Sequence, residues 1–395
     1  MNESLISVEE ALELVRKHTK IGSKIKVDLS ESFGYYLAED SYAPISLPSF
    51  RQSSMDGYAF RWGAQNTFEV VGECKAGDVQ EFELAQNHAL RIFTGARIPD
   101  QADTVVMQEN VLLSGDHISI QKIPEKFNFV RAVGEQVMAG DKLLPAGAKI
   151  NESIIGFLAG FGITEVLVFR KPTITLIVSG NELQEAGSPL KLGAIYESNS
   201  IMLESALKSR GFDSVRTLKI QDDLEATIAA IANGLEDEVV LISGGISVGD
   251  YDFVNEALKA NGVEEIFYKV NQKPGKPLWF GKKDDTLVFA LPGNPASTLT
   301  CFLIYALSAL KIMIGNTDFN LDFQTGVLKH STFNRFGKTI FILATEKNGQ
   351  LEIFDKQASS MLISYALGNA LVMIPNDKEV LAAGESVQYL PINRN

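Results

Sequence analysis

The chain has 395 residues, which at roughly 150 residues per domain predicts two to four domains. Apolar residues make up 45% and charged residues 22%, an ordinary globular composition that excludes disordered, collagen-like and disulfide-scaffold proteins. The 36 lysines and arginines against 49 aspartates and glutamates give a net charge of −13, so we expect no general binding to nucleic acid.

Three sequence features bear on the compartment. The first residues are polar and do not form a signal peptide, and no segment has about 18 uninterrupted apolar residues. Cys74 and Cys301 lie in apolar stretches without a CxxC pattern, so we expect two buried thiols in a reducing compartment. We therefore expect a cytoplasmic protein without a membrane span.

The first part of the chain predicts a helix followed by a β lobe. Apolar positions at helical spacing predict a helix over residues 7–17, with Ser7 as its N-cap and Glu10 as a capping-box partner. Short β-rich runs between residues 45 and 122, separated by Gly, Pro and Asp turns, predict a small, mostly β lobe. Residues 134–171 are loop-rich and then apolar and helical. We expect them to pair with the N-terminal segment, which makes the β lobe an insertion.

From Lys171 onward strands and helices alternate on short loops, which is typical of a doubly wound, mainly parallel sheet. The predicted strands are 173–178, 215–220, 239–242 and 286–291, and the predicted helices are 201–209, 224–235, 254–260 and 296–314. Alternating strands from about residue 319 predict a C-terminal β module. The predicted domains are 1–43 with 135–171 (helical and connecting), 44–134 (β lobe), 172–317 (α/β) and 318–395 (β module).

The loops that follow the predicted parallel strands are rich in glycine, serine and carboxylates. Ligands of such sheets bind beside the carboxyl ends of the strands. Carboxylates gathered at one cleft need a neutralising cation, and Mg²⁺ binds one or two carboxylates together with phosphate oxygens. The candidates are Glu182, Asp222, Asp223, Asp250 and Asp252. Alternatively, Asp222 or Asp223 caps the next helix and the last two are ordinary turn residues.

The loop Ser243–Gly249, with the sequence Ser-Gly-Gly-Ile-Ser-Val-Gly, predicts anion binding. Its glycines allow the backbone to approach an anion closely, and its serine hydroxyls add donors. It matches neither GxGxxG nor GxxxxGK[ST], which disfavours a Rossmann site and a P-loop. A plain tight turn is the alternative. The candidate cofactor-binding residues here are Ser243, Gly244, Gly245, Ser247 and Gly249.

The loop before the long apolar helix supplies three further candidates, Pro292, Asn294 and Pro295. Asn is a good N-cap and Pro suits the first helical position. We therefore expect the positive end of this helix to face the same cleft.

The chain is acidic overall, but its segment 269–277, Lys-Val-Asn-Gln-Lys-Pro-Gly-Lys-Pro, contains three lysines in a stretch of eight residues. A charge-assisted hydrogen bond stabilises an anion by ~1.5–3 kcal/mol, so these lysines can outweigh the negative net charge locally. We take Lys269, Lys273 and Lys276 as cofactor-binding candidates. The alternative is a solvated turn.

The β lobe contains Asp56 within Ser53–Ala59 and Thr94 within Phe93–Pro99. From chemistry alone each segment is more typical of a turn than of a site. The four histidines are scattered and no GxSxG signature is present, which disfavours a hydrolase triad.

Seven segments, in this order, resemble the MoeA and gephyrin E-domain family over nearly the whole chain. Each is a weak pattern alone, whereas seven in order are specific. They are Ser53–Ala59, Ile92–Ala96 with Asp103 and Glu109, Ser179–Leu183, Ile195–Asn199, Ser243–Asp252, Lys273–Pro277 and Pro292–Pro295. The chain departs from the family pattern at Gln136, Asn181 and Lys338, where the family often has Asp, Asp and Arg.

The resemblance implies an elongated homodimer of four-part chains. Its active cleft would lie between the β lobe of one chain and the α/β domain, which resembles MogA, of the other. It implies a molybdopterin molybdotransferase that moves molybdenum from molybdate into adenylylated molybdopterin, with release of AMP and with Mg²⁺. It also implies transient contacts with the molybdopterin adenylyltransferase and with recipient molybdoenzymes.

The resemblance also implies roles for individual residues. The implied functional positions are Asp56, Thr94, Glu182, Asp222 and Asp252, and the implied ligand-binding positions are Lys269, Lys273, Pro292 and Pro295. We take Glu182, Asp222 and Asp252 as the metal ligands.

Two rival functions stay open. The related molybdopterin adenylyltransferase would use only the α/β domain. A non-catalytic scaffold is the other, because animal members of the family also anchor receptors.

Overall fold

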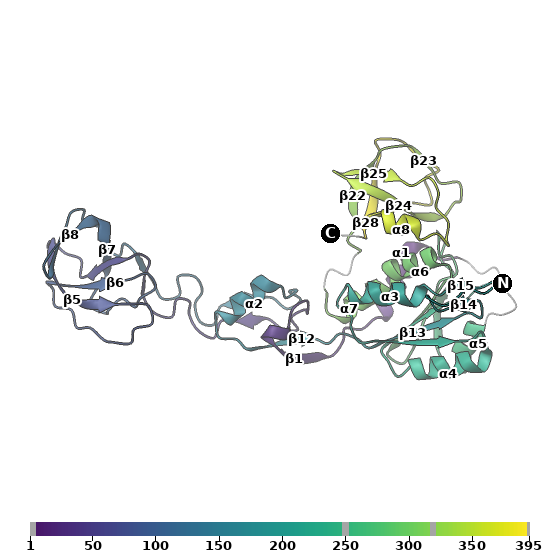
Figure 1. Cartoon of the computed structure of the whole chain (residues 1–395), viewed down its shortest axis with the longest axis horizontal. Helices are drawn as coiled ribbons and strands as arrows, with labels where there is room; N and C mark the ends of the chain where they lie inside the picture. The colour runs from purple at the N-terminus through teal and green to yellow at the C-terminus, as the bar shows by residue number, and fades with distance from the viewer. Residues whose placement is uncertain (1–4, 247–252, 317–320, 393–395) are drawn as a thin grey trace. The chain divides into compact units, whose positions relative to one another are not determined.

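The computed structural model describes residues 5–246, 253–316 and 321–392 (Figure 1). The chain divides into two compact units. Unit 1 comprises residues 1–26, 34–38 and 167–395, and unit 2 comprises residues 27–33 and 39–166. The division falls within strands β1 (Lys24–Asp28) and β12 (Glu165–Phe169), which pair with each other.

Unit 1 contains a six-stranded sheet in the order β16-β13-β17-β21-β20-β18. Four neighbouring strands are parallel, and they are β16 (Val215–Ile220), β13 (Ile174–Ser179), β17 (Val239–Ser243) and β21 (Thr286–Leu291). Two antiparallel strands extend one edge, β20 (Trp279–Lys283) and β18 (Glu264–Tyr268). The sheet is therefore mainly parallel, as predicted, with an antiparallel edge that the sequence analysis did not identify.

Helices cover both faces of this sheet, which confirms the doubly wound prediction (Figure 1). One face packs against α4 (Leu224–Gly234) and α5 (Phe253–Ala260), and the other against α3 (Asn199–Lys208) and the helix that starts at Pro295. Successive residues of a strand point to opposite faces, so Leu241 joins one core and Ile242 the other. Both faces are buried, which explains the near-continuous apolar strands.

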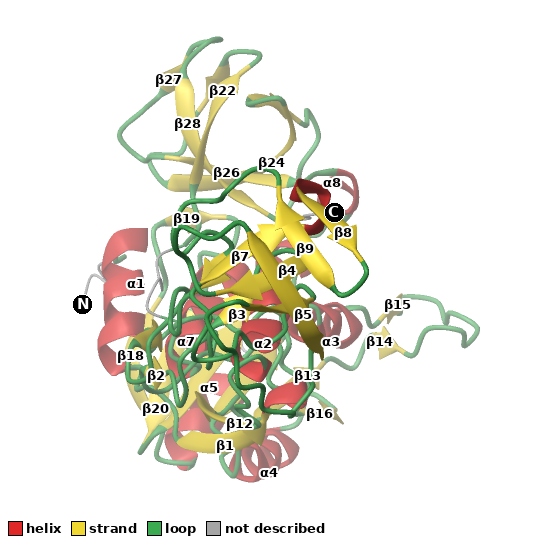
Figure 2. Cartoon of the chain, turned by 90° about the vertical axis from the view of Figure 1, so that its left-hand side faces the viewer, coloured by secondary structure: helices red, strands yellow, loops and turns green. Residues whose placement is uncertain are grey.

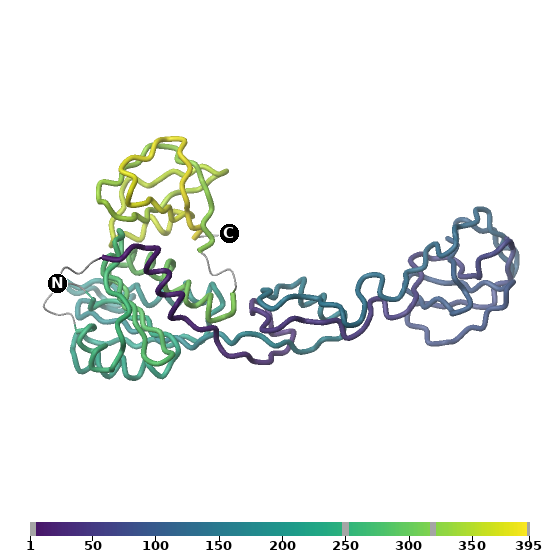
Figure 3. The backbone as a smooth tube through the Cα atoms, turned by 180° about the vertical axis from the view of Figure 1, so that it is seen from behind, coloured from purple at the N-terminus to yellow at the C-terminus, as the bar shows by residue number. Residues whose placement is uncertain are grey.

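The long helix has three parts, α6 (Pro295–Cys301), the π-helical η3 (Phe302–Ala306) and α7 (Leu307–Met313). It is long and apolar enough to cross a membrane, but 89% of its most apolar window is buried inside the protein, as in a core helix. Helix α1 (Val8–His18) packs against its second half; Figure 3 shows this N-terminal segment crossing unit 1. Ser7 caps α1 as predicted, because its side chain accepts a hydrogen bond from the Glu10 N–H.

The C-terminal β module is a closed sheet within unit 1. Its strands pair in the cycle β24-β25-β22-β28-β26 and back to β24, around a core that includes Leu351 and Val372. Their bounds are β22 (Gln324–Leu328), β24 (Thr339–Lys347), β25 (Gln350–Ile353), β26 (Ala370–Ile374) and β28 (Ser386–Pro391). Helix α8 (Ile363–Leu367) lies between β25 and β26 in sequence. The short strand β19 (Gln272–Lys273) pairs with β24, which joins the lysine segment to this module.

Unit 2 contains the predicted β lobe. Its six-stranded sheet has the order β7-β4-β6-β5-β9-β8 and buries apolar clusters on both faces. The strands are β4 (Gly57–Phe60), β5 (Thr67–Cys74), β6 (His88–Ile92), β7 (Thr104–Met107), β8 (Val111–Ser114) and β9 (His117–Ile120). Unit 2 also holds α2 (Glu152–Ala159) and the pair β2 (Ser41–Tyr42) and β11 (Lys142–Leu144). The pairs β1–β12 and β2–β11 confirm that residues 134–171 pair with the N-terminal segment. The exact four-domain boundaries stay a prediction.

Candidate functional site

The ligand loops predicted from the sequence follow strands that end at the same level of the sheet. Ser179 pairs with Ile220, and Ser243 lies between Val178 and Leu291. Because these strands are parallel, the loops after β13, β16, β17 and β21 emerge at one carboxyl edge. The structure therefore gathers these loops as the sequence predicted. The segment between β13 and α3 contains β14 (Leu183–Gln184) and β15 (Ile195–Tyr196), which form a two-stranded ribbon that projects from the α/β part of unit 1 (Figure 2).

Asp222 and Asp223 have different structural roles. The Asp223 side chain accepts from the Ala226 N–H at 2.8 Å, so Asp223 is the N-cap of α4. Asp222 instead joins the loop after β13: its Oδ2 accepts from the Asn181 N–H at 3.2 Å, and its own N–H donates to Asn181 Oδ1 at 3.1 Å. This reciprocal pair places Asp222 beside the segment that carries Glu182. The capping alternative thus applies to Asp223 and not to Asp222.

The described part of the glycine loop is packed closely against the end of β13. A Cβ on Gly244 would lie 2.6 Å from the Ser179 carbonyl oxygen, and the positive φ of +99° also favours glycine there. These glycines therefore let two strand ends approach each other. Ser247, Gly249 and Asp252, together with Asp250, lie outside the described residues.

Asn199, the first residue of α3, links the loops after β17 and β21 by hydrogen bonds. This role was not predicted from the sequence. The Asn199 Nδ2 donates to Ser243 Oγ at 2.9 Å and to the Gly293 carbonyl at 2.8 Å. Its Oδ1 is buried and has no hydrogen-bond partner among the residues that the structure describes. The sequence gives one indication of this role, because Asn199 is the last residue of one of the family-like segments. Its position in the sequence does not show which loops its side chain joins.

A cavity of about 470 Å³ lies between the lysine segment, the start of α6 and the C-terminal module. Three lysines line it, Lys273 and Lys276 as predicted and Lys338 from the C-terminal module. Its polar lining further includes Gln272, Asn294, Ser297, Gln357, Ser359 and Tyr365, and Pro292 also lines it. Two of the predicted anion-binding lysines therefore line a cavity, and most of the lining from the C-terminal module was not predicted from the sequence.

Lys273 and Lys269 are oriented differently. The Lys273 Nζ lies 3.6 Å from the centre of the exposed Phe336 ring, a cation–π contact at the cavity. Lys269 is not part of the cavity lining; its Nζ lies 4.5 Å from the centre of the Tyr268 ring. The structure thus brings two of the three predicted lysines into the cavity.

The start of α6 lines the cavity, in agreement with the expectation that this helix end faces the cleft, but its N–H groups already have a partner. The N–H groups of Ala296 and Ser297 already donate to the Ser359 carbonyl, at 3.0 and 3.3 Å. Asn294 occupies the N-cap position but makes no capping hydrogen bond, and its Nδ2 donates to Ser359 Oγ at 3.1 Å. Because the C-terminal module occupies these donors, positive charge in the cavity comes from ammonium groups rather than from the helix end.

In unit 2 the structure brings Asp56 and Thr94 together. Thr94 donates both its backbone N–H and its hydroxyl to Asp56 Oδ1, each at 2.8 Å. The backbone hydrogen bond first, and then the hydroxyl and the charge of Arg91, hold the pKa of Asp56 below its usual value. The Arg91 guanidinium lies over the Phe93 ring and donates to the Gly57 carbonyl at 2.8 Å. Asp56 is therefore a fixed, ionised carboxylate at neutral pH.

Of the three predicted metal ligands, the described residues include Glu182 and Asp222. Among residues 5–246, 253–316 and 321–392, no three His, Cys, Asp or Glu side chains are grouped so as to hold a metal ion. Within those same residues, Glu182 forms no side-chain hydrogen bond or ion pair, and Asp222 accepts only the Asn181 N–H. Two carboxylates on adjacent loops, with unused oxygen lone pairs, fit a cation that takes one or two protein carboxylates.

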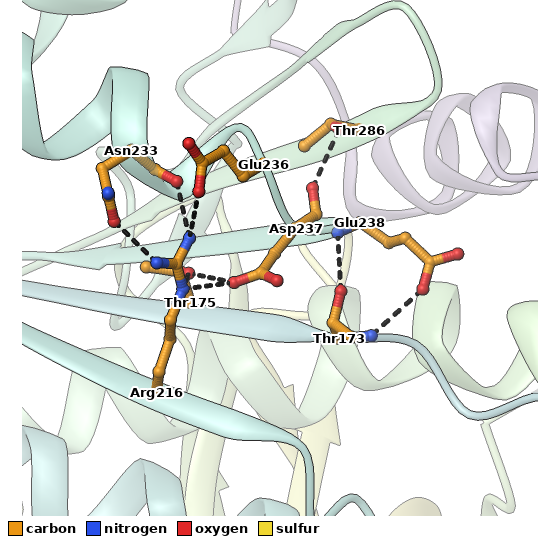
Figure 4. Close-up of polar contacts among 8 residues, drawn as sticks. All are labelled: Thr173, Thr175, Arg216, Asn233, Glu236, Asp237, Glu238 and Thr286. Atoms are coloured by element: carbon orange, nitrogen blue, oxygen red, sulfur yellow. Dashed lines mark hydrogen bonds and ion pairs between the residues drawn. The ribbon is translucent and has the colours of Figure 1, made fainter.

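A second polar cluster lies at the opposite, amino end of the sheet (Figure 4). Arg216 donates to Thr175 Oγ1 at 2.8 Å, to Asp237 Oδ2 at 2.6 Å and to both oxygens of Asn233. Burial alone would raise the pKa of Asp237, but hydrogen bonds from Thr175 and Arg216 outweigh it and lower the pKa below the usual value. The cluster ties β13 and β16 to the turn before β17, so it is structural.

The chain matches three family models in order. They are the "MoeA N-terminal region (domain I and II)" over residues 6–162, the "Probable molybdopterin binding domain" over 175–312 and the "MoeA C-terminal region (domain IV)" over 334–392. A molybdopterin molybdenumtransferase of Staphylococcus epidermidis is 34% identical, with 99% of this chain and 96% of the relative aligned. One of Haemophilus influenzae is 32% identical over 93% of each chain.

A solved structure described as a molybdopterin biosynthesis MoeA protein of Pyrococcus horikosii has a TM-score of 0.86 and 28% identity, with 99% of this chain and 100% of that chain covered. Sequence and structure thus agree over the whole length. The chain belongs to the MoeA family of molybdopterin molybdenumtransferases, the transferases of molybdenum cofactor biosynthesis.

Proposed function

We propose that this chain transfers molybdenum from molybdate into adenylylated molybdopterin and releases AMP. The observation that carries the proposal is the cavity lined by Lys273, Lys276 and Lys338 in a chain of net charge −13. Three ammonium groups at one hollow favour a small, doubly charged anion, and molybdate is such an anion. We assign the cavity to molybdate.

The pterin substrate is proposed to bind at the carboxyl edge of the sheet, next to the cavity. Asn294 and Pro292 belong both to the cavity wall and to the loop after β21, so the two regions are continuous. Ser243 and the glycines after it would face the phosphate groups. Pro295 and Lys269 stay predicted contacts of the same substrate.

Glu182 and Asp222 would hold Mg²⁺ at this edge, with Asp252 as the predicted third ligand. Bound there, Mg²⁺ would neutralise phosphate charge as the adenylyl bond is cleaved. Asn181 has a distinct effect in this chain: it fixes the Asp222 backbone and carboxylate without adding a negative charge. The protein residues therefore orient one carboxylate and leave the neighbouring Glu182 available.

Asp56 and Thr94 are the proposed catalytic pair. Because the pKa of Asp56 is lowered, this residue serves as a hydrogen-bond or proton acceptor toward the substrate and not as an acid. A covalent nucleophile is not required. The thiol of Cys301 is fully buried and its pKa is raised by burial, which makes it unreactive. Rate enhancement would come from positioning and electrostatic stabilisation.

The chain is proposed to work as a cytoplasmic homodimer in which Asp56 and Thr94 of one chain complete the site of the other. It would receive adenylylated molybdopterin from the adenylyltransferase and pass its product to recipient molybdoenzymes. A complementation assay tests the shared site. Asp56→Asn and Glu182→Gln should each be nearly inactive alone. An equimolar mixture of the two variants, allowed to exchange subunits, should regain about a quarter of wild-type activity, because half of the dimers then carry one intact site of two. No regain would contradict the shared site.

The direct test of the reaction is molybdate-dependent release of AMP from adenylylated molybdopterin. Wild type should release AMP only with molybdate, and Asp56→Asn and Glu182→Gln should slow release by at least about 100-fold if both carboxylates act in the transition state. Unchanged rates in both variants would remove the proposed acidic site. ATP-dependent adenylylation of molybdopterin by this chain would favour the rival adenylyltransferase function.

A further inference from the structure

The lysine segment is built around one buried amide. Gln272 is only 1% exposed, although it directly precedes the exposed Lys273. Its Nε2 donates to the carbonyls of Pro274 at 3.0 Å and Gly275 at 3.3 Å. A hydrogen bond from the Val270 N–H to the Lys276 carbonyl, at 3.0 Å, closes the loop. The Gln272 side chain therefore lies inside the turn that carries both cavity lysines.

The other end of this amide is held by the protein core. The Tyr305 hydroxyl, fully buried, donates to Gln272 Oε1 at 2.5 Å. An amide has two donors and one acceptor oxygen, and here the two carbonyls and the hydroxyl match them. The orientation of the amide is thus determined, because the reversed amide would place its oxygen against two carbonyl oxygens.

Tyr305 lies on the π-helical turn η3 of the long core helix. Such turns are rare and often occur at functional sites, because the extra residue redirects the side chains that follow. In this chain the turn coincides with the tyrosine that reaches Gln272. The loop also packs tightly on the same helix: a Cβ on Gly275 would lie 2.4 Å from Cys301 Sγ and 2.9 Å from Gln272 Nε2.

We propose that Gln272 and Tyr305 are positioning residues, which hold the Pro274–Gly275 turn so that Lys273 and Lys276 present their ammonium groups to the cavity. The inference rests on the proposed function, in which these lysines bind molybdate. Two like charges on a short exposed loop repel each other, so an unsupported loop would have to be ordered as the anion binds. A loop ordered in advance by the core avoids this loss of affinity.

The role predicts a specific pattern for Tyr305→Phe, which removes one hydroxyl and leaves Gln272 Oε1 without its donor. The KM and the Kd for molybdate should rise about tenfold while kcat at saturating molybdate stays within about twofold, as for a loss of uniform binding. Gln272→Met, which removes the donors to both carbonyls, should give at least as large an increase.

Tyr389→Phe is the matched control. The Tyr389 hydroxyl also donates to a glutamine oxygen, Gln324 Oε1 at 2.8 Å, but it lies in the C-terminal module outside the cavity lining. Each variant is compared at a temperature at which circular dichroism shows it folded. Tyr389→Phe should lower the melting temperature without changing KM or Kd for molybdate.

A second readout is independent of molybdate. Acetylation of the lysines by acetic anhydride, followed by mass spectrometry, should be at least about threefold faster at Lys273 and Lys276 in Tyr305→Phe than in wild type, because the loop opens locally. Tyr389→Phe should match wild type. If wild type binds no molybdate, the proposed function fails and acetylation still decides the positioning role. Equal acetylation rates in Tyr305→Phe, Gln272→Met and Tyr389→Phe would overturn it.

Discussion

Replacing Lys276 by methionine should weaken molybdate binding without disturbing the fold. Lys276 is exposed at the cavity, and methionine keeps most of the aliphatic stem while removing the charge. At about 4 Å in an aqueous dielectric, a dianion and one unit charge interact by about 2 kcal/mol. Since about 1.4 kcal/mol corresponds to a factor of ten, the expected loss is roughly 30-fold in Kd.

Calorimetric titration of molybdate into wild type and Lys276→Met measures this loss. The difference should shrink as salt is raised, because the Debye length falls from about 10 Å at 0.1 M to about 3 Å at 1 M. Lys347→Met is the control, since Lys347 is an exposed lysine at the end of β24 outside the cavity lining. Equal Kd values for Lys276→Met and wild type, or equal losses in both variants, would refute the reasoning.

Three further predictions concern other parts of the molecule. Arg216→Met should lower stability by about 1–2 kcal/mol, because the half-exposed guanidinium loses several charge-assisted hydrogen bonds, and calorimetry should show this with unchanged molybdate binding. Thr94→Val removes the hydroxyl donor to Asp56, so the pKa of that carboxyl should rise. As the pH is lowered, the variant should therefore lose activity at a higher pH than wild type, which the acid limb of the pH–rate profile measures. Asn181→Asp sets a second carboxylate beside Asp222 and should destabilise the chain by about 1 kcal/mol without metal. Added Mg²⁺ should then raise its melting temperature more than that of wild type, and equal shifts would count against a metal site there.

Much of the fold follows from local pattern. The apolar run over Ile174–Ser179 has a strand's length and β-branched composition, and both of its faces are buried as expected. Strands β18 and β20 escaped prediction because charged residues and a glycine interrupt their apolar pattern. Of the two, β18 lies at the edge of the sheet, where charged residues are common. The π-helical turn escaped it because every residue of η3 is buried, so no amphipathic period exists there to reveal a change of phase.

The site was predicted where its chemistry is local, and missed where it depends on tertiary contact. The lysine segment was visible because three cations lie close together in an acidic chain. Lys338 and Ser359 reach the same cavity only because β19 pairs with β24 in the folded chain. Gln272 was passed over because one amide among lysines gives no sign of being buried.

Whether Asp222 or Asp223 caps the next helix could not be decided from sequence, since adjacent residues of the same type are equally suited to the position. The structure separates them because a hydrogen bond from Asn181, forty-one residues earlier, holds Asp222. The partner of the α6 N-terminus could not be foreseen for a related reason: the Ser359 carbonyl that accepts its N–H groups lies in another part of the chain.

The central claim is that the lysine-lined cavity holds molybdate. Anomalous diffraction at the molybdenum absorption edge, from crystals of the full chain soaked in molybdate, tests it most directly. The strongest peak should lie within hydrogen-bonding distance of the ammonium groups of Lys273, Lys276 or Lys338, and it should weaken in Lys276→Met. A strongest peak elsewhere on the chain, with the cavity empty, would contradict the account.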